Sequence, residues 1–85
     1  MYNLTFAKQA VKALEKMPQV RRERMMKELG KIANSPHGYS GDWKPLKGSD
    51  YWRLRVGGWR AICLMMDDEL VVLVLKIGPR GDVYK

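Results

Sequence analysis

The feature that most constrains the fold is a two-residue turn signal, Gly57-Gly58, with strand-like segments on both sides. Glycine tolerates the positive φ that a tight hairpin turn requires, so paired glycines favour such turns. Side-chain character alternates along residues 51–56, and residues 59–66 are rich in apolar and aromatic types. The pattern predicts an antiparallel hairpin with strands at 51–56 and 59–66.

The register of this hairpin places three arginines on one face. With a two-residue turn, Val56 lies opposite Trp59, and Arg55 lies opposite Arg60. Side chains two residues apart in a strand share a face, so Arg53 joins the other two arginines. Like charges placed opposite each other destabilise a sheet. We therefore expect this face to bind an anion.

Two helices are expected before the hairpin. Residues 2–6 alternate like a strand, residues 7–17 follow a helical apolar pattern, and Pro18 ends this first helix. A second helix is predicted at 19–34. The expected apolar stripe of the first helix is Ala7, Ala10, Val11, Leu14 and Met17. The expected inward face of the second is Met25, Leu29, Ile32 and Ala33, with Val20 and Met26 beside it.

A long apolar strand completes the predicted sheet. Residues 70–77 are almost continuously apolar, which is typical of a central strand buried on both faces. Residues 35–50 are polar and contain glycine and proline, so they predict a loop, anchored to the core by Trp43 and Leu46. The predicted fold is α+β, in the order β-α-α-β-β-β. It has a mostly antiparallel twisted sheet and a helix pair on one face, and residues 1–85 form a single domain.

The charge balance points to an anionic partner. Sixteen lysines and arginines against nine acidic residues give a net charge of +7 and a pI near 9.8. Nucleic acid or an acidic protein is the expected counterpart of such a surface. A basic surface that serves solubility alone is the alternative.

No cofactor or metal site is expected. The single Cys63 and single His37 provide no metal-ligand spacing, and Cys63 is expected to pack as a small buried apolar residue. His37 is expected to lie in a surface loop. The sequence shows no signal peptide, and its longest apolar run, residues 70–75, is too short to span a bilayer. A soluble, cytoplasmic protein is therefore expected.

Several segments together resemble the RelE/ParE family of bacterial type II toxins. They are Leu14–Pro18, Pro45–Gly48, Tyr51–Ile62, and Val71–Gly78 followed by Arg80–Tyr84. The resemblance covers nearly the whole chain and implies a RelE-like fold. It also implies a toxin that a cognate antitoxin holds silent. In this family the RelE branch cuts messenger RNA in the ribosomal A site, whereas the ParE branch inhibits DNA gyrase.

The resemblance also implies a set of site residues. In RelE-like nucleases, basic residues of the sheet and a C-terminal tyrosine act on the RNA. The matching positions here are Arg53, Arg55, Arg60, Arg80 and Tyr84. The best-known RelE toxins carry lysine where Arg53 and Arg55 stand, and arginine cannot give up a proton as lysine can. Further contacts to the RNA backbone are expected from Lys44, Lys47 and Lys76.

The implied reaction is metal-independent RNA cleavage by the 2′-hydroxyl on the adjacent phosphate. Arginine forks suit the phosphate, because each can hold two of its oxygens. Tyr84 is the expected general base, since neighbouring cations favour its phenolate. The general acid stays open: Asp67, Asp68 and Glu69 lie at the wrong end of the hairpin, and Asp82 reads more simply as a turn residue. Trp52 and Trp59 are expected in the core rather than stacked on bases.

Three functions remain open from the sequence. The first is a ribosome-dependent endoribonuclease toxin, favoured by the segment Arg80–Tyr84. The second is a gyrase-inhibiting toxin without nuclease activity, and the third is an inactive or purely partner-binding member of the fold. The expected partners are the ribosome, messenger RNA and an acidic antitoxin that forms a hetero-oligomer with the chain. No membrane partner is expected.

Overall fold

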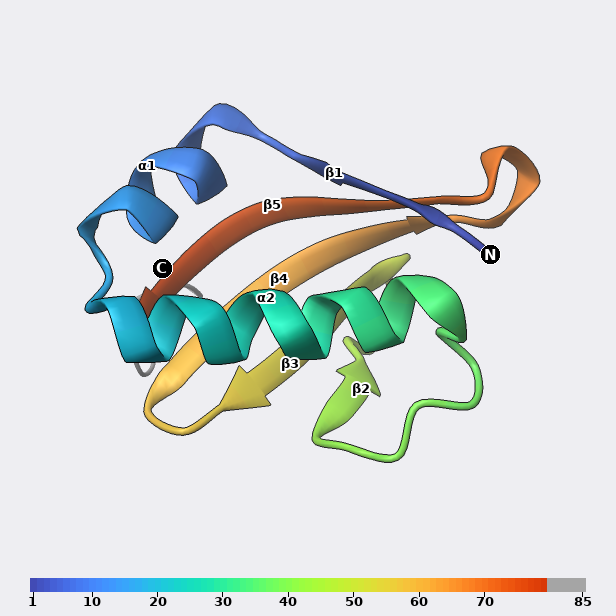
Figure 1. Ribbon diagram of the computed structural model, residues 1–85. Coiled ribbons are helices and arrows are strands. Elements are labelled where there is room, and N and C mark those ends of the chain that lie inside the picture. Colours follow the sequence, from blue (N-terminus) through green and yellow to red (C-terminus); the bar gives the residue numbers. More distant parts are fainter. Residues whose placement is uncertain (80–85) are drawn as a thin grey trace.

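The computed structural model describes residues 1–79, and residues 80–85 lie outside the described part of the chain. Within residues 1–79, two α-helices cover one face of a five-stranded sheet (Figure 1). In chain order the elements are β1 (Asn3–Phe6), α1 (Lys8–Lys16), α2 (Gln19–Asn34), β2 (Trp43–Pro45), β3 (Tyr51–Val56), β4 (Trp59–Met66), the 3₁₀ turn η1 (Asp67–Glu69) and β5 (Val71–Pro79).

The sheet has the strand order β1-β5-β4-β3-β2. β1 runs parallel to β5, and every other neighbouring pair is antiparallel. The predicted α+β class and mostly antiparallel sheet are thus confirmed. The predicted loop at 35–50 is wrong in one respect, because residues 43–45 form the edge strand β2. A strand this short carries almost no periodic signal, and it exists through its pairing with β3.

The predicted inward face of α2 is confirmed. Its buried residues are Met25, Leu29, Ile32 and Ala33. The prediction that Val20 and Met26 lie beside this face is wrong, since both side chains are exposed. In α1, Ala10 is buried and Met17 follows it into the core, but Val11 is exposed. Val11 lies about 100° around the helix from Ala10, and α1 packs on the sheet through a narrow face centred on that small alanine.

The hairpin matches the prediction residue by residue. Arg55 pairs with Arg60 and Val56 pairs with Trp59. Gly57 has a φ of +60°, as the tight turn requires. The two glycines are not equivalent, however, because Gly58 does not adopt a positive φ.

β5 differs from the predicted strand buried on both faces. Val72, Val74 and Ile77 are buried on the side of the helices, but Leu73 is only partly buried and Lys76 is exposed. A bulge explains part of the pattern, since Ile62 pairs with Lys76 while the next residue of β4, Cys63, pairs with Val74. The skipped residue reverses the alternation of side chains beyond it. Lys76 therefore lies on the face opposite to the helices, and Ile77 enters the core.

No helix among the described residues is long and apolar enough to cross a membrane. The two helices are instead partners of the sheet, and the face of the sheet turned away from them is left uncovered by α1 and α2 (Figure 1). We call this the outer face.

Candidate functional site

Basic side chains occupy the outer face in two neighbouring rows. In the first row, cross-strand pairing joins Lys44 of β2 to Arg53 of β3, Arg53 to Ile62 of β4, and Ile62 to Lys76 of β5. Directly paired residues of neighbouring strands share a face. The row therefore carries three cations across four strands, with the apolar Ile62 between two of them.

The second row lies one step toward the hairpin turn. Arg55 of β3 pairs with Arg60 of β4, and Arg60 pairs with Gly78 of β5. Gly78 has no side chain, so Arg55 and Arg60 are the two cations of this row. The three arginines predicted to share a face do so.

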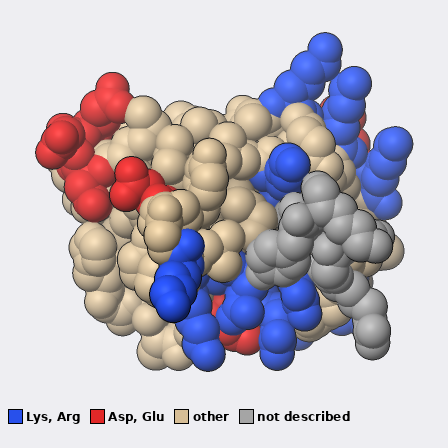
Figure 2. Space-filling view, turned by 180° about the vertical axis from the view of Figure 1, so that it is seen from behind, with Lys and Arg blue, Asp and Glu red and all other residues tan. Residues whose placement is uncertain are grey.

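Figure 2 shows this face of the molecule. Lysine and arginine side chains gather over part of it, whereas acidic side chains collect at another end. The acidic group includes η1, which contains Asp67, Asp68 and Glu69. These carboxylates lie at the far end of β4 from Arg60, which agrees with their exclusion as a general acid.

One acidic side chain lies among the arginines, and the sequence analysis missed it. Arg53 Nη2 donates to Asp42 Oδ1 at 2.5 Å, and Arg55 Nε lies 3.1 Å from Asp42 Oδ2. The Arg53 side chain is 18% exposed and the Arg55 side chain is 46% exposed. The carboxylate therefore bridges a largely buried arginine and a more accessible one, and it offsets part of the positive charge of the two rows.

The position of Asp42 follows from the pleat of β2. Trp43 pairs with Leu54, and both side chains are buried in the core. The residues that flank Trp43 must then point the other way, which places Asp42 and Lys44 on the outer face. The backbone carbonyl of Asp42 also accepts the N–H of Arg55 at 2.9 Å. A buried tryptophan inside a presumed loop was the signal that could have revealed this strand.

The indole of Trp43 holds this segment in place. Its Nε1 donates to the carbonyl oxygen of Pro36 at 3.1 Å, and its ring stacks on Trp52 with centroids 5.0 Å apart. Trp52 is partly buried against the core, as is Trp59. Both tryptophans thus have the packing role expected of them.

One predicted site residue of the described part of the chain, Lys47, lies outside these rows. Lys47 is exposed in the turn between β2 and β3. Arg80 and Tyr84 lie outside the described residues. Cys63 is fully buried, as expected, and burial raises the pKa of its thiol to about 12. It is therefore a packing residue rather than a nucleophile.

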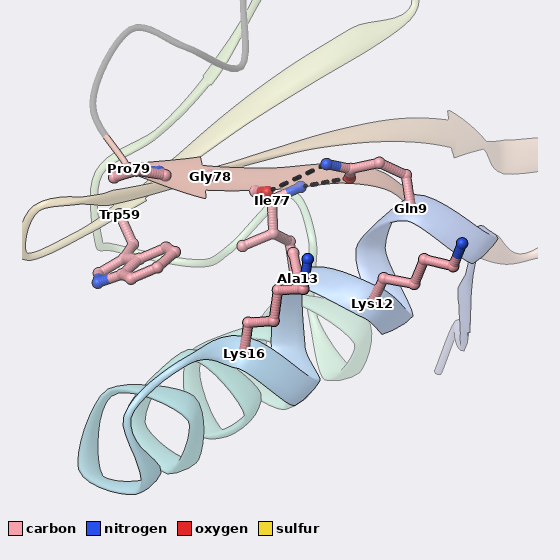
Figure 3. A pocket seen from close by; sticks show the side chains of 8 residues that line it. All are labelled: Gln9, Lys12, Ala13, Lys16, Trp59, Ile77, Gly78 and Pro79. Atoms are coloured by element: carbon pink, nitrogen blue, oxygen red, sulfur yellow. Dashed lines mark hydrogen bonds between the residues drawn. The ribbon is translucent and has the colours of Figure 1, made fainter.

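A hollow of about 380 Å³ lies on the helical side of the sheet, between α1 and the adjoining ends of β4 and β5 (Figure 3). Its lining is Gln9, Lys12, Ala13, Lys16, Trp59, Ile77, Gly78 and Pro79. The Gln9 amide bonds the backbone of Ile77 in both directions, with Ile77 N donating to Oε1 at 3.1 Å and Nε2 donating to the carbonyl oxygen at 3.5 Å. The Gln9 side chain thus provides hydrogen-bond partners for the backbone of β5 beyond the end of β1. Both polar atoms of its amide are occupied by these bonds.

The family follows from a comparison of the sequence. A family model described as the ParE toxin of the type II toxin-antitoxin system, parDE, matches residues 4–84. The chain belongs to the RelE/ParE family of type II toxins. Within the family it is closer to the RelE branch, because the curated proteins and solved structures that it resembles are RelE toxins.

The match to these relatives extends over almost the full length of this chain. The mRNA interferase toxin RelE of Escherichia coli strain K12 is 28% identical over 85 residues, which cover 98% of this chain and 90% of that protein. The isolated E. coli RelE toxin aligns with a TM-score of 0.81 at 28% identity, over 99% of this chain and 92% of that one. RelE in the intact E. coli RelBE toxin-antitoxin complex aligns with a TM-score of 0.79 at 28% identity, over 95% and 99% of the two chains.

Proposed function

We propose that this RelE/ParE family toxin is a ribosome-dependent, metal-independent endoribonuclease that cleaves messenger RNA in the cytoplasm. A cognate acidic antitoxin neutralises it in a hetero-oligomer. The observation that carries the proposal is the pair of basic rows on the outer face, with Arg55 directly opposite Arg60. The 28% identity to a protein named as an mRNA interferase supports the same activity.

The basic rows suit an RNA backbone. Phosphate contacts from lysine and arginine position a nucleic acid and supply most of its electrostatic affinity. Lys44 and Lys76 lie at the two ends of one row across the sheet, so phosphates of a single strand can lie along it. Lys47, which is exposed in the adjoining turn, contacts the same strand farther out in this proposal.

The proposed chemistry uses the RNA as its own nucleophile. The phenolate of Tyr84 takes the proton of a 2′-hydroxyl, and the 2′-oxygen forms a bond to the adjacent phosphorus. The bond from phosphorus to the 5′-oxygen breaks, and that oxygen takes up a proton from solvent water to leave as a hydroxyl. Arg55, Arg60 and Arg80 stabilise the negative charge that grows on the phosphate. The ribosome holds the RNA in the reactive geometry and supplies much of the entropic gain.

Gyrase inhibition is the second candidate function. It is favoured by the family model, whose description is that of a ParE toxin. A gyrase inhibitor would use the same fold as a protein-binding module and would need no reacting groups.

A brief expression pulse separates the two functions. A nuclease leaves new messenger RNA 5′ ends within translated codons, and a gyrase inhibitor changes plasmid supercoiling. We expect new 5′ ends with unchanged supercoiling. Loss of supercoiling without RNA cleavage would reverse the assignment.

Arg60→Ala tests the chemistry. Loss of one preorganised charge stabiliser lowers cleavage by about 10²–10³-fold. Single-turnover cleavage on programmed ribosomes at saturating toxin measures it. Lys27→Ala is the control, because it also removes one charge but lies on α2, across the sheet from the proposed site. Equal losses in both variants would show that only net charge matters.

In the same assay Tyr84→Phe removes the proposed base, and a wild-type rate for this variant would exclude that role.

Co-expression tests the antitoxin. The net charge of +7 predicts that an acidic protein encoded beside the toxin gene co-purifies with it and restores growth. Well-tolerated expression of the wild-type toxin alone would contradict this part of the proposal.

A further inference from the structure

The three arginines of the outer face are not equivalent, and Asp42 makes the difference. Arg53 is largely buried, and its Nη2 is engaged by Asp42 Oδ1. Its Nε is also buried, without a hydrogen-bond acceptor among the described residues. With Nη2 bound to Asp42 and Nε buried, Arg53 has few accessible N–H groups left to bind a phosphate. Its position instead fixes the carboxylate beside it.

Arg55 is held by the other oxygen of the same carboxylate. Within residues 1–79, the polar contact of its guanidinium is the one from Nε to Asp42 Oδ2 at 3.1 Å. A guanidinium that uses Nε in this way keeps the edge formed by its two Nη atoms. That end-on edge is one of the two edges of a guanidinium that can bind two oxygens of a phosphate at once.

Asp42 itself is rigidly placed. Its carbonyl oxygen accepts the backbone N–H of Arg55, and the next residue, Trp43, is buried, stacked and hydrogen-bonded. The carboxylate is therefore anchored at the backbone and at both oxygens. A long arginine side chain loses conformational entropy when it binds a ligand. Because the bond from Nε to Asp42 already restricts Arg55, less entropy is lost when a phosphate binds.

We propose that Asp42 is a positioning residue of the nuclease site: held by Arg53, it orients Arg55 so that the Nη edge faces the RNA phosphate. The division of labour assigns Arg53 to support and Arg55 to the phosphate. This inference deepens the proposed function and rests on it for its kinetic part. The orientation of Arg55 by Asp42 is a separate claim that can be measured without cleavage.

The first measurement is structural. In the ¹H–¹⁵N spectrum of the purified toxin, the Nε–H of Arg55 is expected as a resolved signal that exchanges slowly with water, because it is hydrogen-bonded to a fixed carboxylate. Asp42→Asn removes the charge with little change in shape, and Arg53→Gln removes the support. Both variants are expected to lose the Arg55 signal or broaden it while the backbone spectrum stays native. An unchanged Arg55 signal in both variants would overturn the proposal.

The second measurement is kinetic, with Asp50→Asn as the matched control. Asp50 is exposed in the turn before β3, so this variant changes the net charge by the same amount at a distance from the arginines. On programmed ribosomes, Asp42→Asn is expected to lower the single-turnover rate about 10- to 100-fold, the cost of a misoriented catalytic group. The toxin concentration at half-saturation should change less than threefold, and Asp50→Asn should behave as wild type.

The opposite role for Asp42 predicts the opposite result. If the carboxylate merely occupied the phosphate site and competed with RNA, Asp42→Asn would tighten half-saturation and keep or raise the rate, and the proposal would be wrong. Asp42 and Arg53 act as a unit in our account, so Arg53→Gln should have little further effect in the Asp42→Asn background. Multiplying losses would contradict it. A wild-type toxin that cleaves no RNA would overturn the proposed function, and the spectra would then decide the orientation of Arg55 by itself.

Discussion

Asp67 forms a small polar cluster at the opposite end of the molecule from the arginines. Tyr2 Oη donates to Asp67 Oδ1 at 2.6 Å, and His37 Nε2 lies 3.4 Å from the same oxygen. The hydrogen bond from Tyr2, with a smaller contribution from His37, holds the pKa of the Asp67 carboxyl below its ordinary value. The same bond to the carboxylate raises the pKa of Tyr2. The cluster ties the N-terminus to η1 and to the loop after α2.

Tyr2→Phe tests this cluster through its pH dependence. A carboxyl whose folded pKa is depressed adds stability above its unfolded pKa of about 3.9, and this stability is lost as the pH falls through the folded value. Tyr2→Phe should therefore lower the free energy of unfolding at pH 7, and the difference from wild type should shrink toward pH 3. Urea denaturation at the two pH values measures it. Tyr51→Phe, at an exposed tyrosine outside the cluster, is the control and should show no such trend. A difference that is constant with pH would mean that Tyr2 acts through packing alone.

At the same scale, sequence reasoning found the arginines but not their counterion. Period-two alternation was enough to place Arg53, Arg55 and Arg60 on one face, because it depends only on local geometry. Asp42 is fixed by the pairing of Trp43 with Leu54, which are distant in the sequence. Its role could be inferred only after β2 was recognised as a strand.

Among the elements, the hairpin of β3 and β4 was the most predictable part of the fold. Its signals are local: a glycine pair and the alternation on both sides of it. The bulge in β5 was not predictable, because it depends on how β5 pairs with β4 at Ile62 and Cys63. The bulge matters for the site, since alternation without it would have placed Lys76 on the same side as Val74.

The two turn glycines allow a matched test of the hairpin. Gly57 has a φ of +60°, and a side chain there costs about 1–2 kcal/mol because of its left-handed conformation. Gly58 has no positive φ, and a Cβ added there meets no atom within 4 Å. Gly57→Ala should therefore destabilise the protein by about 1 kcal/mol, whereas Gly58→Ala should be neutral or stabilise it by up to ~1 kcal/mol. Thermal unfolding of the two variants measures the contrast. Equal destabilisation would show that the turn needs both glycines.

Across the whole molecule, charge is distributed unevenly. Lysine and arginine side chains gather over part of the outer face and acidic ones at another end, where η1 lies (Figure 2), and α2 carries five basic and two acidic residues. At an ionic strength of 0.1 M, interactions between exposed charges are largely screened beyond about 10 Å. The net charge of +7 therefore attracts RNA only in a general way, and the arrangement on the outer face decides where the RNA lies.

Single lysine removals distinguish this arrangement from net charge. Lys44→Ala and Lys76→Ala each remove a cation from the first row on the outer face, whereas Lys27→Ala removes an exposed one from α2. If the RNA backbone follows the row, each outer-face variant should raise the half-saturating concentration of the toxin for programmed ribosomes several-fold, and the single-turnover rate at saturation should stay nearly wild type. The reason is that a phosphate contact adds affinity in the ground state and the transition state alike.

Each of these variants should also reduce the slope of log affinity against log salt by about 0.7–1, the value for one lost phosphate contact. Lys27→Ala should leave half-saturation and salt slope unchanged. Equal effects of all three variants would show that the total charge of the toxin attracts the RNA. The proposal that the RNA backbone follows the outer face would then be wrong.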